Sequence, residues 1–211
     1  MNYLAHLFLS DHSPEGFVGS LLGDFVKGNL DGSYPSKIAF EIVLHRKVDS
    51  FTDTHDVFRK SKHRISEKRR RFAGIMVDVF YDHFLAKNWT EFSNVPLDAF
   101  SQTVYEALKT HQAILPEVLQ NRLSAIIENN LLVSYKTLEG IDLALRRLSR
   151  RLKRENPLGE GVQELKKNYA EFESDFITFF PELIAYVGEL RKQQWFYGAS
   201  NQHTLDQSDT R

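Results

Sequence analysis

The segment from Ile75 to Ala86 has the length and composition of a buried helix, but it contains Asp78, Asp82 and His83. A helix that is apolar almost all round is normally buried, and an unpaired carboxylate inside a protein needs a metal, a cation or several hydrogen bonds. Asp78 and Asp82 are four residues apart, so they lie on one face of a helix. The sequence therefore predicts that a cation or several donors compensate these two carboxylates.

A second helical stretch, residues 38–56, repeats this arrangement with His45 and Asp49, and Asp24 shares an apolar stripe with Phe17 and Leu21. The chain has no cysteine, so only histidine and carboxylate side chains are available as metal ligands. Such a set favours Mn²⁺ or Mg²⁺, with Fe²⁺ or Zn²⁺ also compatible. Each acid alone could instead cap a helix or pair with a nearby arginine. As a group, the residues predicted to bind one metal are Asp24, His45, Asp49, Asp78 and Asp82.

Other polar residues near these positions have alternative interpretations. His83 points about 100° away from Asp82 on a helix, so it could support the ligands, donate a proton, or be a buried histidine with satisfied bonds. Asp53, four residues beyond Asp49, could be a ligand, a supporting residue or an exposed acid. The His55-Asp56 dipeptide lies at the expected end of its helix, and we interpret it as a chance pair at a solvated terminus.

The elements that must position these residues are helices, because apolar residues recur every three or four positions and alternating strand patterns are scarce. The fold class predicted is all-α, a single-domain helical bundle of seven or more helices. Ser13-Pro14 is typical of a helix start, and Pro181 is expected to kink a long final helix. We expect a domain over residues 1–194 and a polar, disordered tail over 195–211. Helices are expected over residues 38–56, 75–86, 97–113, 138–154 and 162–192.

Composition excludes several classes of protein. The chain has 211 residues, is 42% hydrophobic and 26% charged, and has a formal net charge of -1, so no overall field selects nucleic acid or membrane. The first ten residues lack the basic segment of a signal peptide, and no uncharged stretch reaches 18 residues. The sequence therefore predicts a cytoplasmic protein without a nucleic-acid or membrane partner, and it leaves the oligomeric state open.

Positive charge is nevertheless concentrated in two runs. Residues 59–71 hold eight lysines and arginines against one glutamate, and residues 146–154 hold six with no acid. Most such runs are solvated faces, but a local excess of this size attracts acidic proteins or phosphate. Aromatic residues are not interleaved as they are in stacking platforms for nucleic acid. The residues predicted to bind an acidic partner are Arg59, Lys60, Arg64, Arg69, Arg70, Arg71, Arg147, Arg150 and Arg151.

Four motifs carry a family resemblance. They are residues 1–7 (MNYLAHL), 21–29 (LLGDFVKGN), 45–53 (HRKVDSFTD) and 77–85 (VDVFYDHFL). In this order they resemble the acyl carrier protein phosphodiesterase family, and a weaker resemblance extends to about residue 192. The family's motif positions correspond to His6, Asp24, His45, Arg46, Asp49, Asp53, Asp78, Asp82 and His83.

The resemblance implies a helical fold distantly related to the His-Asp phosphohydrolases and a preference for Mn²⁺. It also implies hydrolysis of the phosphodiester that links 4'-phosphopantetheine to a serine of acyl carrier protein, an acidic partner. From their placement, Arg46 is expected to stabilise the phosphoryl oxygens, and His83 or His6 to protonate the leaving serine oxygen. The alternatives are an HD-type nucleotide phosphohydrolase, or a non-enzymatic helical module that binds an acidic protein.

Overall fold

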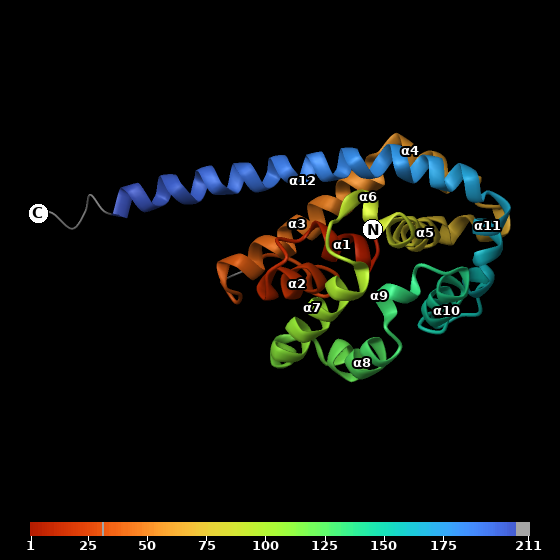
Figure 1. The fold of residues 1–211 in the computed structure, drawn as a ribbon, viewed down its shortest axis with the longest axis horizontal. Coiled ribbons are helices and arrows are strands. Elements are labelled where there is room, and N and C mark those ends of the chain that lie inside the picture. The colour runs from red at the N-terminus through yellow and green to blue at the C-terminus, as the bar shows by residue number, and fades with distance from the viewer. Residues whose placement is uncertain (31, 206–211) are drawn as a thin grey trace, which may run out of the picture.

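A computed structural model describes residues 1–30 and 32–205, with side chains through residue 193. Within these residues the chain forms α-helices and short 3₁₀ helices and no β-strand, which confirms the all-α prediction (Figure 1). The 3₁₀ helices are η1 (Glu67–Phe72), η2 (Gln112–Ile114) and η3 (Pro157–Glu160). The α-helices are α1 (Tyr3–Leu9), α2 (Pro14–Leu22), α3 (Ser36–Thr54), α4 (Asp56–Arg64), α5 (Ala73–Lys87), α6 (Trp89–Phe92), α7 (Leu97–Thr110), α8 (Glu117–Glu128), α9 (Leu131–Ser134), α10 (Leu138–Ser149), α11 (Val162–Lys167) and α12 (Tyr169–Leu205).

Proline and serine residues lie at the beginning of several of these helices, and the start at Ser13-Pro14 is the one predicted above. Ser13 caps α2, where its Oγ accepts a hydrogen bond from the Gly16 N–H at 3.0 Å, and Pro14 is the first helical residue. Pro96 and Pro116 directly precede α7 and α8, where a backbone N–H would have no intrahelical acceptor and its absence costs no bond. The starts of these helices are therefore set by local chemistry.

The ends of the later helices differ from the prediction. Helix α10 ends at Ser149 and not near residue 154, and the expected helix over 162–192 is divided into α11 and α12 at Asn168. Pro181 lies inside α12, which continues to Leu205 and so passes the predicted domain end at residue 194. Residues 206–211 of the predicted tail lie outside the described residues, and the division into domain and tail stays a prediction. None of the helices in the described part of the chain is long and apolar enough to cross a membrane.

Helix α5 forms the centre of the core. Eleven of its fifteen residues are buried, so almost its whole circumference packs against other helices, among them α1, α4, α10 and α12. Helix α12 packs against α3, α4 and α5, and it lies along one edge of the body in Figure 1. Aromatic rings fill the contact between α5 and α12, including Phe84 against Phe176 and Tyr81 against Phe179. The short helix α1 packs against α5 in this core.

Helix α1 is held at both ends by side chains from distant parts of the chain. At its beginning, the Asp82 carboxylate of α5 accepts hydrogen bonds from the Leu4 and Ala5 N–H groups at 2.8 and 3.0 Å. At its end, the Arg191 guanidinium donates to the Leu9 carbonyl at 2.7 Å and pairs with the buried Glu41 carboxylate. These contacts satisfy helix-end groups that a seven-residue helix cannot satisfy alone.

Replacing Asp82 by alanine is expected to lower the free energy of unfolding by about 2 to 4 kcal/mol, because two buried N–H groups lose their acceptor. Urea unfolding in the presence of a chelator, followed by circular dichroism, measures this. The control is Asp98→Ala in the first turn of α7, where the aspartate is exposed and a loss below about 1 kcal/mol is expected. Equal stability losses in the two variants would contradict the structural role of Asp82.

Candidate metal centre

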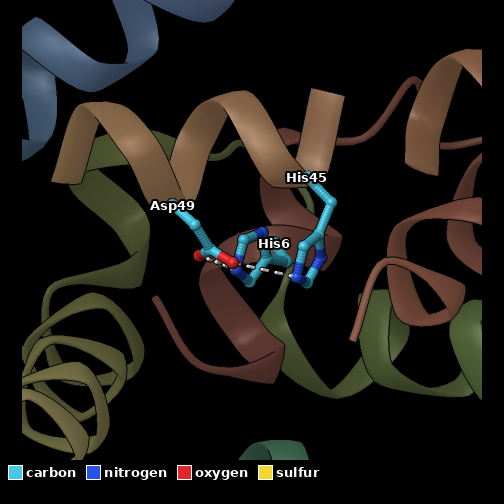
Figure 2. A group of neighbouring side chains, drawn as sticks. All are labelled: His6, His45 and Asp49. Atoms are coloured by element: carbon cyan, nitrogen blue, oxygen red, sulfur yellow. Dashed lines mark hydrogen bonds and ion pairs between the residues drawn. The ribbon is translucent and has the colours of Figure 1, made fainter. Parts of the chain in front are cut away.

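Two histidines and one aspartate meet between α1 and α3. The Nε2 atom of His6 lies 3.1 Å from Oδ1 of Asp49, and the Nε2 atom of His45 lies 3.3 Å from Oδ2 of the same carboxylate (Figure 2). The two imidazole rings are stacked, with centroids 3.6 Å apart and an interplanar angle of 11°. One potential ligand atom from each residue lies within 4.8 Å of the others. This spacing suits a single divalent ion with ligand distances of about 2.1 Å.

The sequence around α2 and α3 fixes the His45 ring. His45 and Asp49 are four residues apart on α3, so their side chains share one face of the helix. The Nδ1 atom of His45 lies 2.7 Å from the Ser20 carbonyl oxygen, to which its N–H donates. Gly23, directly after α2, lies against the same ring, and a Cβ at this position would overlap ring atoms of His45. The local backbone therefore leaves the ring one orientation.

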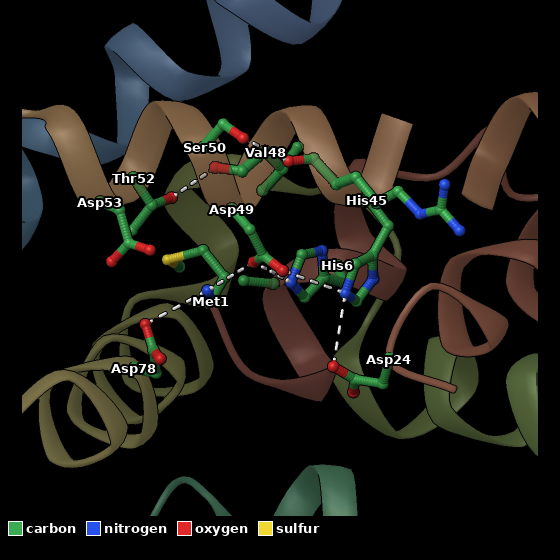
Figure 3. A network of polar contacts seen from close by, with 12 residues as sticks. Met1, His6, Asp24, His45, Val48, Asp49, Ser50, Thr52, Asp53 and Asp78 are labelled. Carbon is green, nitrogen blue, oxygen red and sulfur yellow. Dashed lines mark hydrogen bonds and ion pairs between the residues drawn. The ribbon is translucent and has the colours of Figure 1, made fainter. Parts of the chain in front are cut away.

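The Nε2 atom of His45 is the feature that most directly indicates a metal. It is buried and makes no hydrogen bond of good geometry within the described residues, although the carboxylates of Asp49 and Asp24 lie 3.3 and 3.5 Å away (Figure 3). Because Nδ1 donates to Ser20, a neutral His45 ring carries its lone pair on Nε2, as in most histidines that bind metals. Two imidazole nitrogens and two carboxylates therefore fit a divalent cation.

The charges of the cluster also favour a cation. Burial acts to lower the pKa of His45, but the Asp24 and Asp49 carboxylates outweigh it and raise this pKa to about 9. Burial would raise the pKa of Asp49, yet the two histidines hold it well below its ordinary value. Burial, aided by neighbouring His45, lowers the pKa of His6 to about 4, so this ring is neutral at pH 7. The carboxylates thus hold a proton on His45, and a divalent ion would compete for the same position.

Asp78 is connected to the cluster through the amino group of Met1. This group lies 3.1 Å from Oδ1 of Asp49 and 3.2 Å from Oδ1 of Asp78 (Figure 3). Burial would lower the pKa of the amino group, but the two carboxylates raise it to about 10, so it is an ammonium at neutral pH. Asp78 therefore compensates a buried positive charge beside the cluster.

The structure does not place Asp82 in the cluster, because its carboxylate binds the first N–H groups of α1, and burial raises its pKa to about 7. His83 is also elsewhere engaged: Nδ1 lies 2.8 Å from the Tyr135 carbonyl oxygen, and Nε2 lies 2.8 Å from the Tyr169 hydroxyl. These contacts match the interpretation of a buried histidine with satisfied bonds, and the expected role of His83 as a proton donor stays a prediction. Arg46 donates to the carbonyls of Val26 and Gly28, so it anchors the loop after α2.

Comparison with known proteins places these residues in a family. The family model described as acyl carrier protein phosphodiesterase matches residues 1–183, a range that contains the whole cluster. The chain belongs to the acyl carrier protein phosphodiesterase family. No solved structure gives a significant match, so the relation to the His-Asp phosphohydrolase fold stays a prediction.

Relatives of this family are similar over nearly their whole length. The acyl carrier protein phosphodiesterase of Photorhabdus laumondii is 33% identical over 198 residues, which cover 93% of this chain and 98% of the relative. That of Serratia proteamaculans is 34% identical over 185 residues, covering 87% and 96%. That of Escherichia coli O157:H7 is 32% identical over 186 residues, covering 88% and 96%.

Asp53 and Asp56, two further acids near the end of α3, lie outside the cluster. The Asp53 side chain is 72% exposed, with Lys62 at 3.7 Å, and the Asp56 side chain is 99% exposed. His55 ends α3 and pairs with Glu182 at 3.2 Å. The interpretation of His55-Asp56 as a pair at a helix terminus is thus in agreement with the structure.

The place of His6 differs from the prediction, which did not include it among the metal ligands. It was expected to donate a proton, but its low pKa and its place beside Asp49 suit a ligand. The signal available was the histidine inside the apolar run of residues 4–9, which predicts burial without naming its neighbours. Only the packing of α1 against α3 brings it to His45 and Asp49.

Proposed function

We propose that this family member is a metal-dependent phosphodiesterase that cleaves holo-acyl carrier protein into apo-acyl carrier protein and 4'-phosphopantetheine. Its relatives are named for this activity, and the chain matches them over almost their full length. The observation that carries the metal dependence is the cluster of His6, His45 and Asp49 with the unbonded Nε2 of His45. We propose that these three residues, with Asp24, hold the ion.

When bound, a divalent ion would polarise a phosphoryl oxygen and lower the pKa of a water molecule, which supplies a nucleophile at neutral pH. The chain itself prepares the ligands. Asp49 contacts both imidazoles, and the Ser20 carbonyl fixes the tautomer of His45. The low pKa of His6 keeps its lone pair available. The Asp24 and Asp49 side chains are 48% and 41% exposed, so the cluster is open to solvent on their side.

Mn²⁺ is the ion that we propose, with Mg²⁺ or Fe²⁺ as alternatives. Mg²⁺ prefers an all-oxygen shell, whereas two imidazole nitrogens favour transition metals. The absence of cysteine in the sequence removes the thiolate ligands with which many structural zinc sites are built. The mixed nitrogen and oxygen set is compatible with Mn²⁺, Fe²⁺ and Zn²⁺, and the family resemblance favours Mn²⁺ among them.

Incubation of holo-acyl carrier protein with the full chain and Mn²⁺ is expected to yield apo-acyl carrier protein. Mass spectrometry detects the loss of the 4'-phosphopantetheinyl group, and EDTA should stop the reaction until Mn²⁺ is restored. Mn²⁺ at about 100 times its Kd should also stabilise the fold by about 2.7 kcal/mol, which a thermal shift assay reveals. A protein that neither binds Mn²⁺ nor shifts its unfolding temperature would contradict a metal-dependent function.

Nucleotides belong in the same assay, because an HD-type nucleotide phosphohydrolase would use the same kind of cluster. The family match over residues 1–183 favours the carrier protein. Faster hydrolysis of a nucleotide than of holo-acyl carrier protein would instead support the nucleotide phosphohydrolase. A non-enzymatic binding module would bind the carrier protein and leave both substrates intact.

A further inference from the structure

A cavity of about 370 Å³ opens between the beginning of α1 and the helices α8 to α10. We call it the arginine pocket. Its walls combine apolar side chains with guanidinium groups, and within the described residues its lining contains no acid. Ile126, Leu131 and Leu148 contribute apolar surface. The arginines that line it are Arg122, Arg147, Arg150 and Arg151.

These four arginines differ from the first basic run in having no partner. Within the described residues, none of the four makes an ion pair, a hydrogen bond through its side chain or a ring contact. In the first run, Lys60 and Arg64 pair with the buried Asp175 at 3.1 and 2.9 Å. Arg69 pairs with Glu160 at 2.8 Å and Glu164 at 2.9 Å.

Much of the charge of the first run is therefore neutralised within the fold, by ion pairs that join α4 and η1 to η3, α11 and α12. Arg59 has an acid at 3.7 Å, Arg70 donates to the Ile65 carbonyl, and Arg71 lies over the Phe72 ring. Arg147, Arg150 and Arg151 of the second run thus keep their charge available to a partner, and Arg122 joins them from outside both sequence runs.

The arginine pocket lies beside the candidate metal centre. Asn2 and Tyr3 line the pocket, while the neighbouring Met1 amino group contacts Asp49. His6 follows Tyr3 by three residues on α1, a rise of about 4.5 Å along the helix axis. Asn2 is fixed in the wall by a 3.2 Å hydrogen bond to the Tyr135 hydroxyl. A protein seated on the pocket would hold its phosphodiester close to the cluster.

We propose that the arginine pocket docks an acidic, amphipathic segment of the carrier protein, with carboxylates on the arginines and an apolar side chain on the pocket floor. The proposal rests on the proposed function and adds the surface by which the substrate is recognised. Four unpaired cations around apolar walls are complementary to such a segment. The prosthetic arm beyond its phosphate is uncharged and would leave the guanidiniums unmatched.

Nucleic acid is the less suitable polyanion. Single strands bind on positively charged grooves whose aromatic rings are open for stacking. Tyr135, one of the two aromatic residues of the lining, is only 2% exposed, and its hydroxyl already bonds Asn2. An acidic protein surface needs no such platform.

The test uses the full chain, apo-acyl carrier protein and two variants, each with three substitutions that remove a positive charge. Apo-acyl carrier protein lacks the prosthetic arm and is not cleaved, so its affinity reports docking without chemistry. The pocket variant is Arg122→Gln/Arg150→Gln/Arg151→Gln, and the control variant is Arg59→Gln/Lys68→Gln/Arg71→Gln, which removes the same charge from the first basic run. Isothermal titration calorimetry at low and high salt gives the affinities. Hydrolysis of bis(4-nitrophenyl) phosphate with Mn²⁺ monitors the metal centre.

At low salt the pocket variant is expected to bind apo-acyl carrier protein about tenfold more weakly, and to show a KM for holo-acyl carrier protein raised by a similar factor. Its affinity should also depend less on salt than that of the wild type. The control variant should stay within about twofold of the wild type. Hydrolysis of the small diester should be unchanged in both variants.

An affinity of the pocket variant within twofold of the wild type, or an equal loss in the control variant, would overturn the proposal. Displacement of apo-acyl carrier protein by an equal concentration of an oligonucleotide would do so as well. Failure of the proposed function is a separate result: the wild type would then leave holo-acyl carrier protein uncleaved, whatever the affinity of the two variants.

Discussion

An Asp49→Asn variant is expected to lose Mn²⁺ binding and to hydrolyse holo-acyl carrier protein at least about 100-fold more slowly. The expected loss exceeds that caused by mutating residues that only support ligands, which is typically 10- to 100-fold. Asp49 contacts both imidazoles and the Met1 amino group, so an uncharged amide removes the attraction at the centre of the cluster. Calorimetric titration with Mn²⁺ measures binding, and mass spectrometry of the carrier protein measures turnover.

The matched control is Asp53→Asn, the same substitution one turn later on α3. The Asp53 side chain is 72% exposed and lies 3.7 Å from Lys62, so its replacement should change Mn²⁺ affinity and turnover by less than about twofold. Circular dichroism must show that both variants are folded. Near-normal Mn²⁺ binding by folded Asp49→Asn would refute the assignment of the cluster as the metal site.

A Gly23→Ala variant is expected to weaken Mn²⁺ binding at least about tenfold, although it replaces none of the proposed ligands. The added Cβ would overlap the His45 ring, which must then move away from the Ser20 carbonyl and lose its fixed orientation. Crowding of this kind costs about 1 to 3 kcal/mol of folding free energy. Thermal unfolding is measured with EDTA and with Mn²⁺. The unfolding temperature with EDTA reports the loss of stability, and a smaller rise of this temperature on adding Mn²⁺ reports the loss of Mn²⁺ affinity.

Gly188→Ala is the control for this substitution. An added Cβ at Gly188 in α12 would meet nothing within 4 Å, and alanine is the better helix former by about 1 kcal/mol. This variant should be slightly more stable than the wild type and bind Mn²⁺ normally. An unchanged Mn²⁺-dependent shift in Gly23→Ala would mean that His45 does not need this close contact.

The fold could be predicted from the sequence because its signals are local. The spacing of apolar residues, the Ser13 cap and the prolines before α7 and α8 act within one or two turns of helix, and the structure contains these elements. Helix ends in the polar region after Ser149 could not be placed, because charged residues there suit both a helix and a solvated loop.

The site could be predicted only in part, because burial of a charge does not reveal what compensates it. Asp49 and Asp82 both lie on predicted inward faces, yet one meets two histidines and the other meets the N–H groups of α1. The same holds for the basic residues. Arg64 and Arg150 both lie in basic runs of the sequence. Asp175, 111 residues away from Arg64, pairs with Arg64, whereas no acid in the described residues pairs with Arg150. Such partners are set by tertiary packing.

The anchoring of α1 has a consequence for the order of events during synthesis. Its first turn is bonded to a residue 78 positions later, and its last carbonyl to a residue 182 positions later. Contacts between residues so distant in sequence form slowly compared with the helices themselves. The ribosome delivers α1 well before it delivers Arg191. Until Arg191 has emerged, α1, which carries His6, lacks the contact that holds its C-terminal end.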